Sequence, residues 1–145
     1  MDGDLQHKPN DILELLKVFK QKNADFVIGS RNLFQRKKHN LGFFRLSASR
    51  FLILIVNLLL GNKTSDPMSG FFIFKKKIYK KEKKRMFNKG YKVLMDLLYI
   101  NNEKKKIFDV EINFDTRKKG KSKMNFKILL LLLNMILYKF YAKFS

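Results

Sequence analysis

The 145-residue chain has no cysteine, no tryptophan and few acidic side chains. Without cysteine it has neither a disulfide framework nor a zinc site built on thiolates, and this fits a reducing compartment. Only 12 Asp and Glu stand against 32 Lys and Arg, which gives a formal net charge of +20. That surplus favours an anionic partner: nucleic acid, an anionic membrane leaflet or a phosphorylated ligand. An AT-rich coding sequence, which over-uses Lys, Asn, Ile and Phe, would give the same surplus without any partner.

Long apolar runs are missing as well. The apolar block Ile128–Tyr138 is shorter than the roughly 20 residues that a helix needs to cross a bilayer. The first residues, Met1-Asp2-Gly3-Asp4, lack the apolar core of a signal peptide, so we expect the chain to stay in the cytosol. A hydrophobic content of 46%, with 15 Phe, is typical of a folded domain rather than a disordered chain.

Helical and strand-like patterns alternate along the chain, which predicts an α/β fold with a mixed sheet flanked by helices. Apolar residues at helical spacing predict helices at Pro9–Lys22, Phe43–Leu60, Tyr91–Ile100 and Met124–Phe144. Buried runs and period-two alternation predict strands at Asp25–Gly29, Gly70–Phe74 and Ile107–Phe114. Between them lies a basic segment, Lys75–Phe87, in which eight of the eleven residues 75–85 are Lys or Arg.

The last predicted helix, within residues 124–145, is apolar and basic. Lys127, Lys139 and Lys143 flank its apolar block. An amphipathic helix that lies in the membrane interface, with its lysines at the headgroups, fits this pattern. The alternative is an ordinary helix that packs on the core.

The acidic pair near the start of the chain is the first candidate site. Asp2 and Asp4 stand two residues apart, so in extended backbone both carboxylates can bind one hard cation such as Mg²⁺ or Mn²⁺. Such a cation can neutralise a diphosphate leaving group. Acidic residues ahead of a helix also serve as caps or partners of the helix dipole, so the pair alone does not decide the function.

The surrounding motifs do point to a family. Met1-Asp2-Gly3-Asp4-Leu5-Gln6-His7 resembles the Met-Asp-Ala-Asp-Leu-Gln-His signature of polyprenyl-phosphate glycosyltransferases of the dolichol-phosphate mannose synthase type, in glycosyltransferase family 2. Further segments are similar to motifs of that family in the same order: Gly29-Ser30-Arg31, Arg45 with Ser49-Arg50, Asp66-Pro67-Met68-Ser69-Gly70-Phe71-Phe72, Gly90-Tyr91-Lys92-Val93-Leu94, Val110-Glu111-Ile112 with Phe114, and Arg117 with Gly120 and Ser122-Lys123.

The resemblance implies a GT-A fold and an inverting, metal-dependent transfer. A phosphate oxygen of a polyprenyl (dolichyl) phosphate would attack the anomeric carbon of a nucleotide-sugar, with GDP-mannose as the expected donor. Carried over by position, the metal ligands would be Asp2, Asp4 and Gln6. The acceptor phosphate would be bound by Arg31, Arg45 and Ser49, and the donor diphosphate by Arg117 and Lys123. The catalytic residues would be Asp4, Arg31 and Arg45.

The chemistry of these side chains agrees with that reaction. A phosphate monoester is already largely ionised near neutral pH, so it needs positioning and charge neutralisation more than a general base. Arginine suits this task because its guanidinium is planar and permanently charged. We therefore expect Asp2, Arg31, Arg45 and Arg117 to converge on one side of the sheet.

The sequence also departs from the family. A GT-A domain of this type begins well before the acidic pair, with a nucleotide-binding half that has no counterpart here. We therefore expect residues 1–123 to be the acceptor-side portion of the domain and to be inactive by themselves. The other half would be encoded upstream or in a separate chain, and the protein would attach peripherally to the cytoplasmic face of a membrane.

Two alternatives remain. A basic module that binds anionic membranes or nucleic acid without catalysis would explain the charge but not the motifs, so nucleic acid is not an expected partner. A non-catalytic remnant of a larger enzyme would be compatible with the family resemblance.

Overall fold

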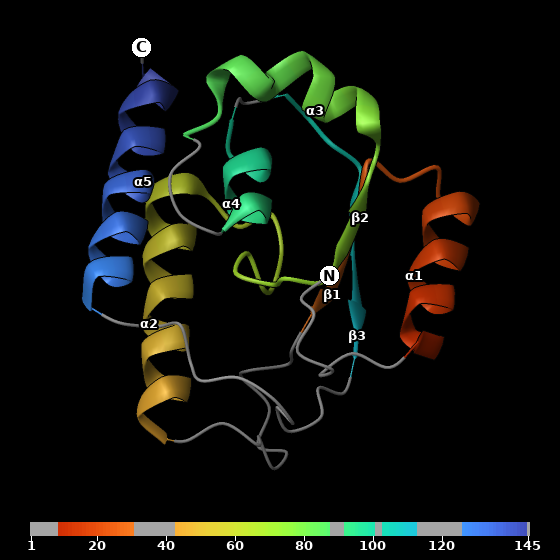
Figure 1. The fold of residues 1–145 in the computed structure, drawn as a ribbon, viewed down its shortest axis with the longest axis horizontal. Coiled ribbons are helices and arrows are strands. Elements are labelled where there is room, and N and C mark those ends of the chain that lie inside the picture. Colours follow the sequence, from red (N-terminus) through yellow and green to blue (C-terminus); the bar gives the residue numbers. More distant parts are fainter. Residues whose placement is uncertain (1–8, 31–42, 88–91, 101–102, 113–125, 145) are drawn as a thin grey trace.

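The computed structural model describes residues 9–30, 43–87, 92–100, 103–112 and 126–144. The elements follow one another in the order α1 (Pro9–Gln21), β1 (Phe26–Ser30), α2 (Phe43–Leu60), β2 (Phe72–Phe74), α3 (Lys76–Glu82), the 3-10 helix η1 (Lys83–Arg85), α4 (Val93–Leu98), β3 (Ile107–Glu111) and α5 (Phe126–Phe144). The predicted α/β class is confirmed (Figure 1).

A three-stranded mixed sheet forms the centre of the fold, with the strand order β2-β1-β3. The middle strand, β1, pairs antiparallel with β2 and parallel with β3. Because β1 and β3 run in the same direction, both end at one edge of the sheet, which we call the carboxyl edge. The opposite edge, where Phe26 and Ile107 begin these strands, is the amino edge. The predicted mixed sheet is confirmed.

Each face of the sheet carries its own core, because successive side chains of a strand point to opposite faces. On β1, Val27 packs in the smaller core with Leu15 of α1, which is fully buried. Phe26 and Ile28 belong to the larger core, which α2, α4 and α5 complete. Figure 1 shows α1 on one side of the sheet and α2, α4 and α5 on the opposite side.

The larger core is closed by α2 and α5, which lie side by side (Figure 1). Leu52 and Val56 of α2 belong to the same apolar cluster as Met135 and Ile136 of α5. The outer side of α5 remains uncovered, and Tyr141 on that side is 69% exposed. Across the part of the chain that the structure describes, no helix is both long and apolar enough to span a membrane.

A buried ion pair joins α5 to α4. The Nζ of Lys139 lies 2.5 Å from Oδ1 of Asp96, and the two side chains are only 1% and 5% exposed. The same carboxylate oxygen accepts a hydrogen bond from the backbone N–H of Phe87. The expectation that Lys139 lies at lipid headgroups is therefore wrong, because Asp96 holds this ammonium group inside the protein.

Helix α4 is shorter than the predicted helix 91–100. The backbone leaves the helical conformation at Tyr99, where φ is −108° and ψ is 27°. The Tyr99 hydroxyl then donates a hydrogen bond to the carbonyl of Gly61. A tertiary contact thus sets the end of α4, which the spacing of apolar residues does not reveal.

Candidate functional site

Strand β1 ends at the carboxyl edge, directly before one of the predicted site residues. Arg31 follows Ser30, the last residue of β1, directly in the sequence. Of the predicted site residues, the structure describes Ser49, half-buried on α2, and the backbone of Arg45 one turn earlier. The remaining predicted site residues lie outside the described residues: Asp2, Asp4, Gln6, Arg31, Arg117 and Lys123. Their convergence stays a prediction.

A spacing of four residues places Arg45 and Ser49 on the same side of α2. The resemblance assigns both residues to the acceptor phosphate.

The described part of the edge is built around residues 61–71, which we call the edge loop. Its Ser69 hydroxyl donates a 2.7 Å hydrogen bond to the carbonyl of Gly29. The backbone N–H of Phe71 donates in turn to the Ser69 hydroxyl, and the N–H of Gly29 donates to the Phe71 carbonyl. Two segments that resemble separate family motifs, Gly29-Ser30 and Asp66–Phe72, therefore meet at one point.

Close packing at this point requires glycine at position 29. A Cβ atom on Gly29 would lie 2.6 Å from Cδ1 of Ile112 and 2.6 Å from Cδ1 of Phe71. It would also lie 3.2 Å from the Phe71 carbonyl oxygen, which belongs to the backbone and cannot rotate away. The glycine of the Gly-Ser-Arg motif thus allows the edge loop to approach β1.

Asp109 of β3 anchors the beginning of the edge loop. Its Oδ1 accepts a 2.6 Å hydrogen bond from the Thr64 hydroxyl. Its Oδ2 accepts 2.7 Å hydrogen bonds from both the N–H and the hydroxyl of Ser65. Hydrogen bonds to a charged acceptor are roughly twice as strong as neutral ones, so this cluster fixes the chain just before the fully buried Asp66.

The sequence pattern alone does not indicate this role of Asp109. Its only signal was its place on the polar side of the alternating pattern of the predicted strand 107–114. That pattern shows which face a residue occupies, but it cannot show that Thr64 and Ser65, more than 40 residues earlier in the chain, lie opposite the carboxylate.

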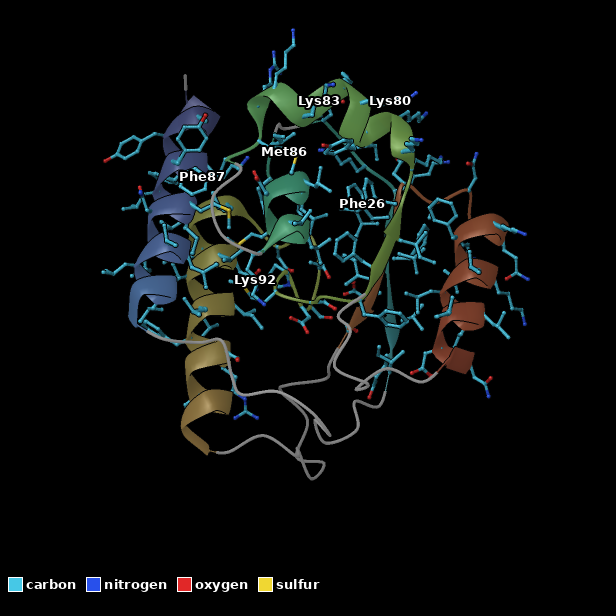
Figure 2. The ribbon with its side chains drawn as sticks, viewed as in Figure 1. Phe26, Lys80, Lys83, Met86, Phe87 and Lys92 are labelled. Carbon is cyan, nitrogen blue, oxygen red and sulfur yellow. The ribbon has the colours of Figure 1, made fainter. Side chains whose placement is uncertain are left out.

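The edge loop is also tied to α4. The Nζ of Lys92, labelled in Figure 2 below α4, donates a 2.9 Å hydrogen bond to the Met68 carbonyl. Lys63 donates from its Nζ to the Leu98 carbonyl. Burial raises the pKa of Tyr99 to about 12, so its hydroxyl stays protonated and keeps its bond to Gly61 across the physiological range. Contacts from β1, β3 and α4 together hold the loop in one conformation.

Among residues 9–30, 43–87, 92–100, 103–112 and 126–144, no group of three or more His, Asp or Glu side chains could hold a metal ion. The implied ligands, Asp2, Asp4 and Gln6, lie outside those ranges.

Comparison with known proteins assigns the sequence to a family. Residues 1–82 match the family described as glycosyl transferase family 2. A dolichol-phosphate mannosyltransferase of Pyrococcus furiosus is 34% identical over 131 residues, which cover 89% of this chain and 36% of that protein. A dolichol-phosphate mannosyltransferase of Mycosarcoma maydis is 29% identical over 144 residues, which cover 97% of this chain and 48% of that protein. The chain thus spans less than half the length of either relative.

Proposed function

The chain belongs to glycosyl transferase family 2, and from this premise we propose that it forms the acceptor side of an enzyme that transfers mannose from GDP-mannose to a polyprenyl (dolichyl) phosphate. The names of both relatives support this substrate class, since each is similar to most of this chain. The structural observation that carries the proposal is the hydrogen bond from Ser69 to Gly29, because it joins two family-like motifs that lie 40 residues apart.

Arginine side chains have the central role in the proposed mechanism. Arg31 and Arg45, with the hydroxyl of Ser49, hold the acceptor phosphate so that one of its oxygens faces the anomeric carbon of the donor. Arg117 and Lys123 neutralise the donor diphosphate. Attack from the side opposite the leaving nucleotide inverts the anomeric centre. Positioning and charge compensation supply the rate enhancement, since the phosphate nucleophile is already ionised.

The implied metal fits the chemistry of the residues assigned to it. Two carboxylates and an amide oxygen, from Asp2, Asp4 and Gln6, form a hard oxygen donor set that suits Mg²⁺ or Mn²⁺. A divalent cation bound there supplies charge neutralisation for the leaving diphosphate. The protein's own contribution is to hold these three oxygen donors next to the donor phosphates.

The edge loop provides the rigid base for the acceptor residues. Gly29 and Ser30 lead directly into Arg31, and the contacts of Ser69 and Asp109 fix the chain on both sides of Asp66. A site residue that follows a fixed segment loses less conformational entropy when it binds its ligand than one on a mobile loop. We therefore assign the edge loop a positioning role.

Peripheral attachment to the cytoplasmic face of a membrane belongs to the same proposal, since the lipid tail of the acceptor stays in the bilayer. The exposed apolar side of α2 supports it. Phe51, Leu54 and Leu58 are 63%, 56% and 83% exposed, and their spacing aligns them along one side of the helix. Such a stripe is typical of a helix whose outer side contacts lipid or another protein.

A chimera tests the proposed transfer. The upstream portion of the Pyrococcus furiosus relative, joined to this chain, should transfer labelled mannose from GDP-mannose to detergent-solubilised dolichyl phosphate, and only with divalent metal present. The 145-residue chain by itself should show no transfer. In the chimera, Asp4→Asn should abolish turnover, and Arg45→Lys should raise the KM for the acceptor more than that for the donor.

Lys17→Gln, an exposed change on α1, is the matched control and should leave both KM values unchanged. A folded chimera that transfers equally well with Asp4→Asn would contradict the metal assignment. Transfer by the 145-residue chain alone would contradict the expectation that it is only part of a catalytic domain.

A further inference from the structure

A cationic surface lies at the amino edge of the sheet. The exposed side chains of α3 and η1 include seven cations: Lys76, Lys77, Lys80, Lys81, Lys83, Lys84 and Arg85. Glu82, the only acidic residue of these two elements, is 2% exposed. Because Glu82 is buried, every exposed charged side chain of α3 and η1 is positive. Figure 2 labels Lys80 and Lys83 on this end of the molecule.

The neighbouring segment 103–106 extends this cationic surface. Lys104 and Lys106 are exposed there. The acidic residue of the segment, Glu103, lies with its carboxylate 2.5 Å from Nζ of Lys81, and this bond lowers the pKa of Glu103 below its ordinary value. One exposed carboxylate thus offsets only a small part of the positive charge around it.

An aromatic contact connects the cationic surface to α5. The ring of Phe87, which follows η1 closely, packs against the ring of Tyr138 at a centroid distance of 5.5 Å. Figure 2 shows Phe87 beside α5. At this part of α5, Leu137 is 48% exposed and Tyr141 is 69% exposed. Cations, tyrosines and an exposed leucine therefore lie on adjoining elements.

We propose that α3, η1 and the carboxyl-terminal half of α5 form one surface that binds acidic phospholipid headgroups. Lys and Arg attract an anionic leaflet, while tyrosine suits the boundary between headgroups and acyl chains. This inference goes beyond the proposed function, because the surface lies at the amino edge, whereas the acceptor residues are proposed at the opposite, carboxyl edge. Nucleic acid would use the cations but would leave the exposed Leu137 without a role.

Vesicle sedimentation with the full 145-residue chain tests the surface directly. The probes are phosphatidylcholine vesicles with and without phosphatidylserine. A triple variant, Lys80→Gln, Lys83→Gln and Lys84→Gln, removes three exposed cations from the surface. Each basic residue near an anionic leaflet contributes roughly a fivefold factor, so the variant should bind phosphatidylserine vesicles about 100-fold more weakly.

The matched control removes the same charge elsewhere: Lys17→Gln, Lys20→Gln and Lys22→Gln, all exposed at or just after α1. It should lose much less affinity than the α3 and η1 variant, with unchanged circular dichroism in both. Tyr141→Ser should weaken the binding that persists at high salt, because apolar burial is not screened. Equal loss in the two triple variants would overturn the proposal and indicate a net-charge effect.

A second set of experiments distinguishes lipid binding from nucleic-acid binding. It also tests this inference separately from the proposed function. If the α3 and η1 variant lost retention on single-stranded RNA but kept its vesicle binding, the lipid proposal would be overturned. Transfer by the chimera to detergent-solubilised acceptor should survive the triple substitution. Failure of that transfer in the unmodified chimera would contradict the proposed function and leave the vesicle result standing.

Discussion

At the carboxyl edge of the sheet, Ser69 and Gly29 form a hydrogen bond between buried, uncharged groups. At the amino edge, Asp25 and Lys75 form an ion pair of 3.1 Å, and both side chains are more than 20% exposed. The buried contacts tolerate little displacement, because a buried donor or acceptor without a partner costs free energy. Water can replace the ion pair between the partly exposed Asp25 and Lys75 at little cost in free energy. The contacts at the carboxyl edge therefore fix the position of the edge loop, whereas the charged side chains at the amino edge contribute mainly electrostatic potential.

The largest effect on stability should come from Asp96 and Lys139, because their ion pair is charged and also buried. Lys139→Met leaves the Asp96 carboxylate buried without its cation and should lower the free energy of unfolding by about 3–5 kcal/mol. Urea denaturation followed by circular dichroism measures the change. Combining it with Asp96→Asn, which keeps an acceptor for the Phe87 N–H, should restore most of the stability. A loss below about 1 kcal/mol in the single variant would show that the pair is exposed in solution.

The next largest effect should follow from filling the space at Gly29. Gly29→Val would push side-chain atoms into Ile112 and Phe71 and should cost about 1–3 kcal/mol. Thermal unfolding measures the loss. Lys77→Val at the exposed amino edge is the comparison and should leave the melting temperature nearly unchanged. Equal effects at the two positions would remove the distinction between the edges.

A smaller loss is expected when one hydroxyl is removed from the edge loop. Ser69→Ala leaves the Gly29 carbonyl and the Phe71 N–H without their common partner and should cost about 1–2 kcal/mol. Ser65→Ala also removes a hydrogen bond, but water can replace that hydroxyl at an exposed position. Hydrogen exchange of the Phe71 amide should accelerate in the first variant and not in the second. The reverse order would mean that Asp109, rather than Ser69, holds this part of the loop.

The smallest effect concerns Asp25 and depends on pH. Burial opposes ionisation of this carboxyl, but the Lys106 N–H and the Lys75 ammonium outweigh it and hold the pKa of Asp25 below 3.8. The charged form is thus favoured by folding, so its contribution is complete above pH 3.8 and is lost as the pH falls through the folded-state pKa. Asp25→Asn should cost less than about 1 kcal/mol at neutral pH.

Parallel urea titrations of the native chain and this variant check the pH dependence. The difference in unfolding free energy between them should shrink as the solution is acidified. A difference that grows under acid would contradict the direction of the pKa shift.

The sequence predicted the sheet well because its signal is local. Period-two alternation in residues 107–114 and the apolar residues 26–28 each need only a few neighbouring residues to be recognised. The partners of Asp109 and Lys139 could not be predicted in this way. Both side chains look like ordinary surface charges in the sequence, and only the tertiary fold brings Thr64 to the first and Asp96 to the second.

At the candidate site, too, the sequence does not show the tertiary contacts. The family-like motifs include Gly29 and Ser69, but their spacing does not show that the Ser69 hydroxyl donates a hydrogen bond to the Gly29 carbonyl. That contact depends on how the chain crosses from α2 to β2. The roles of Arg31 and Arg117 rest on the resemblance alone, since both lie outside the described residues.

The parallel pairing of β1 with β3 has a consequence for the order of folding during synthesis. Asp25 and Lys106, which begin this pairing, are 81 residues apart in the chain. When β1 leaves the ribosome, β2 can pair with one of its sides long before β3 has been made. The other side of β1 then presents unpaired backbone groups, which can pair with strands of other chains. Formation of contacts this distant in sequence is slow, so this side of the nascent sheet is where a chaperone would be needed.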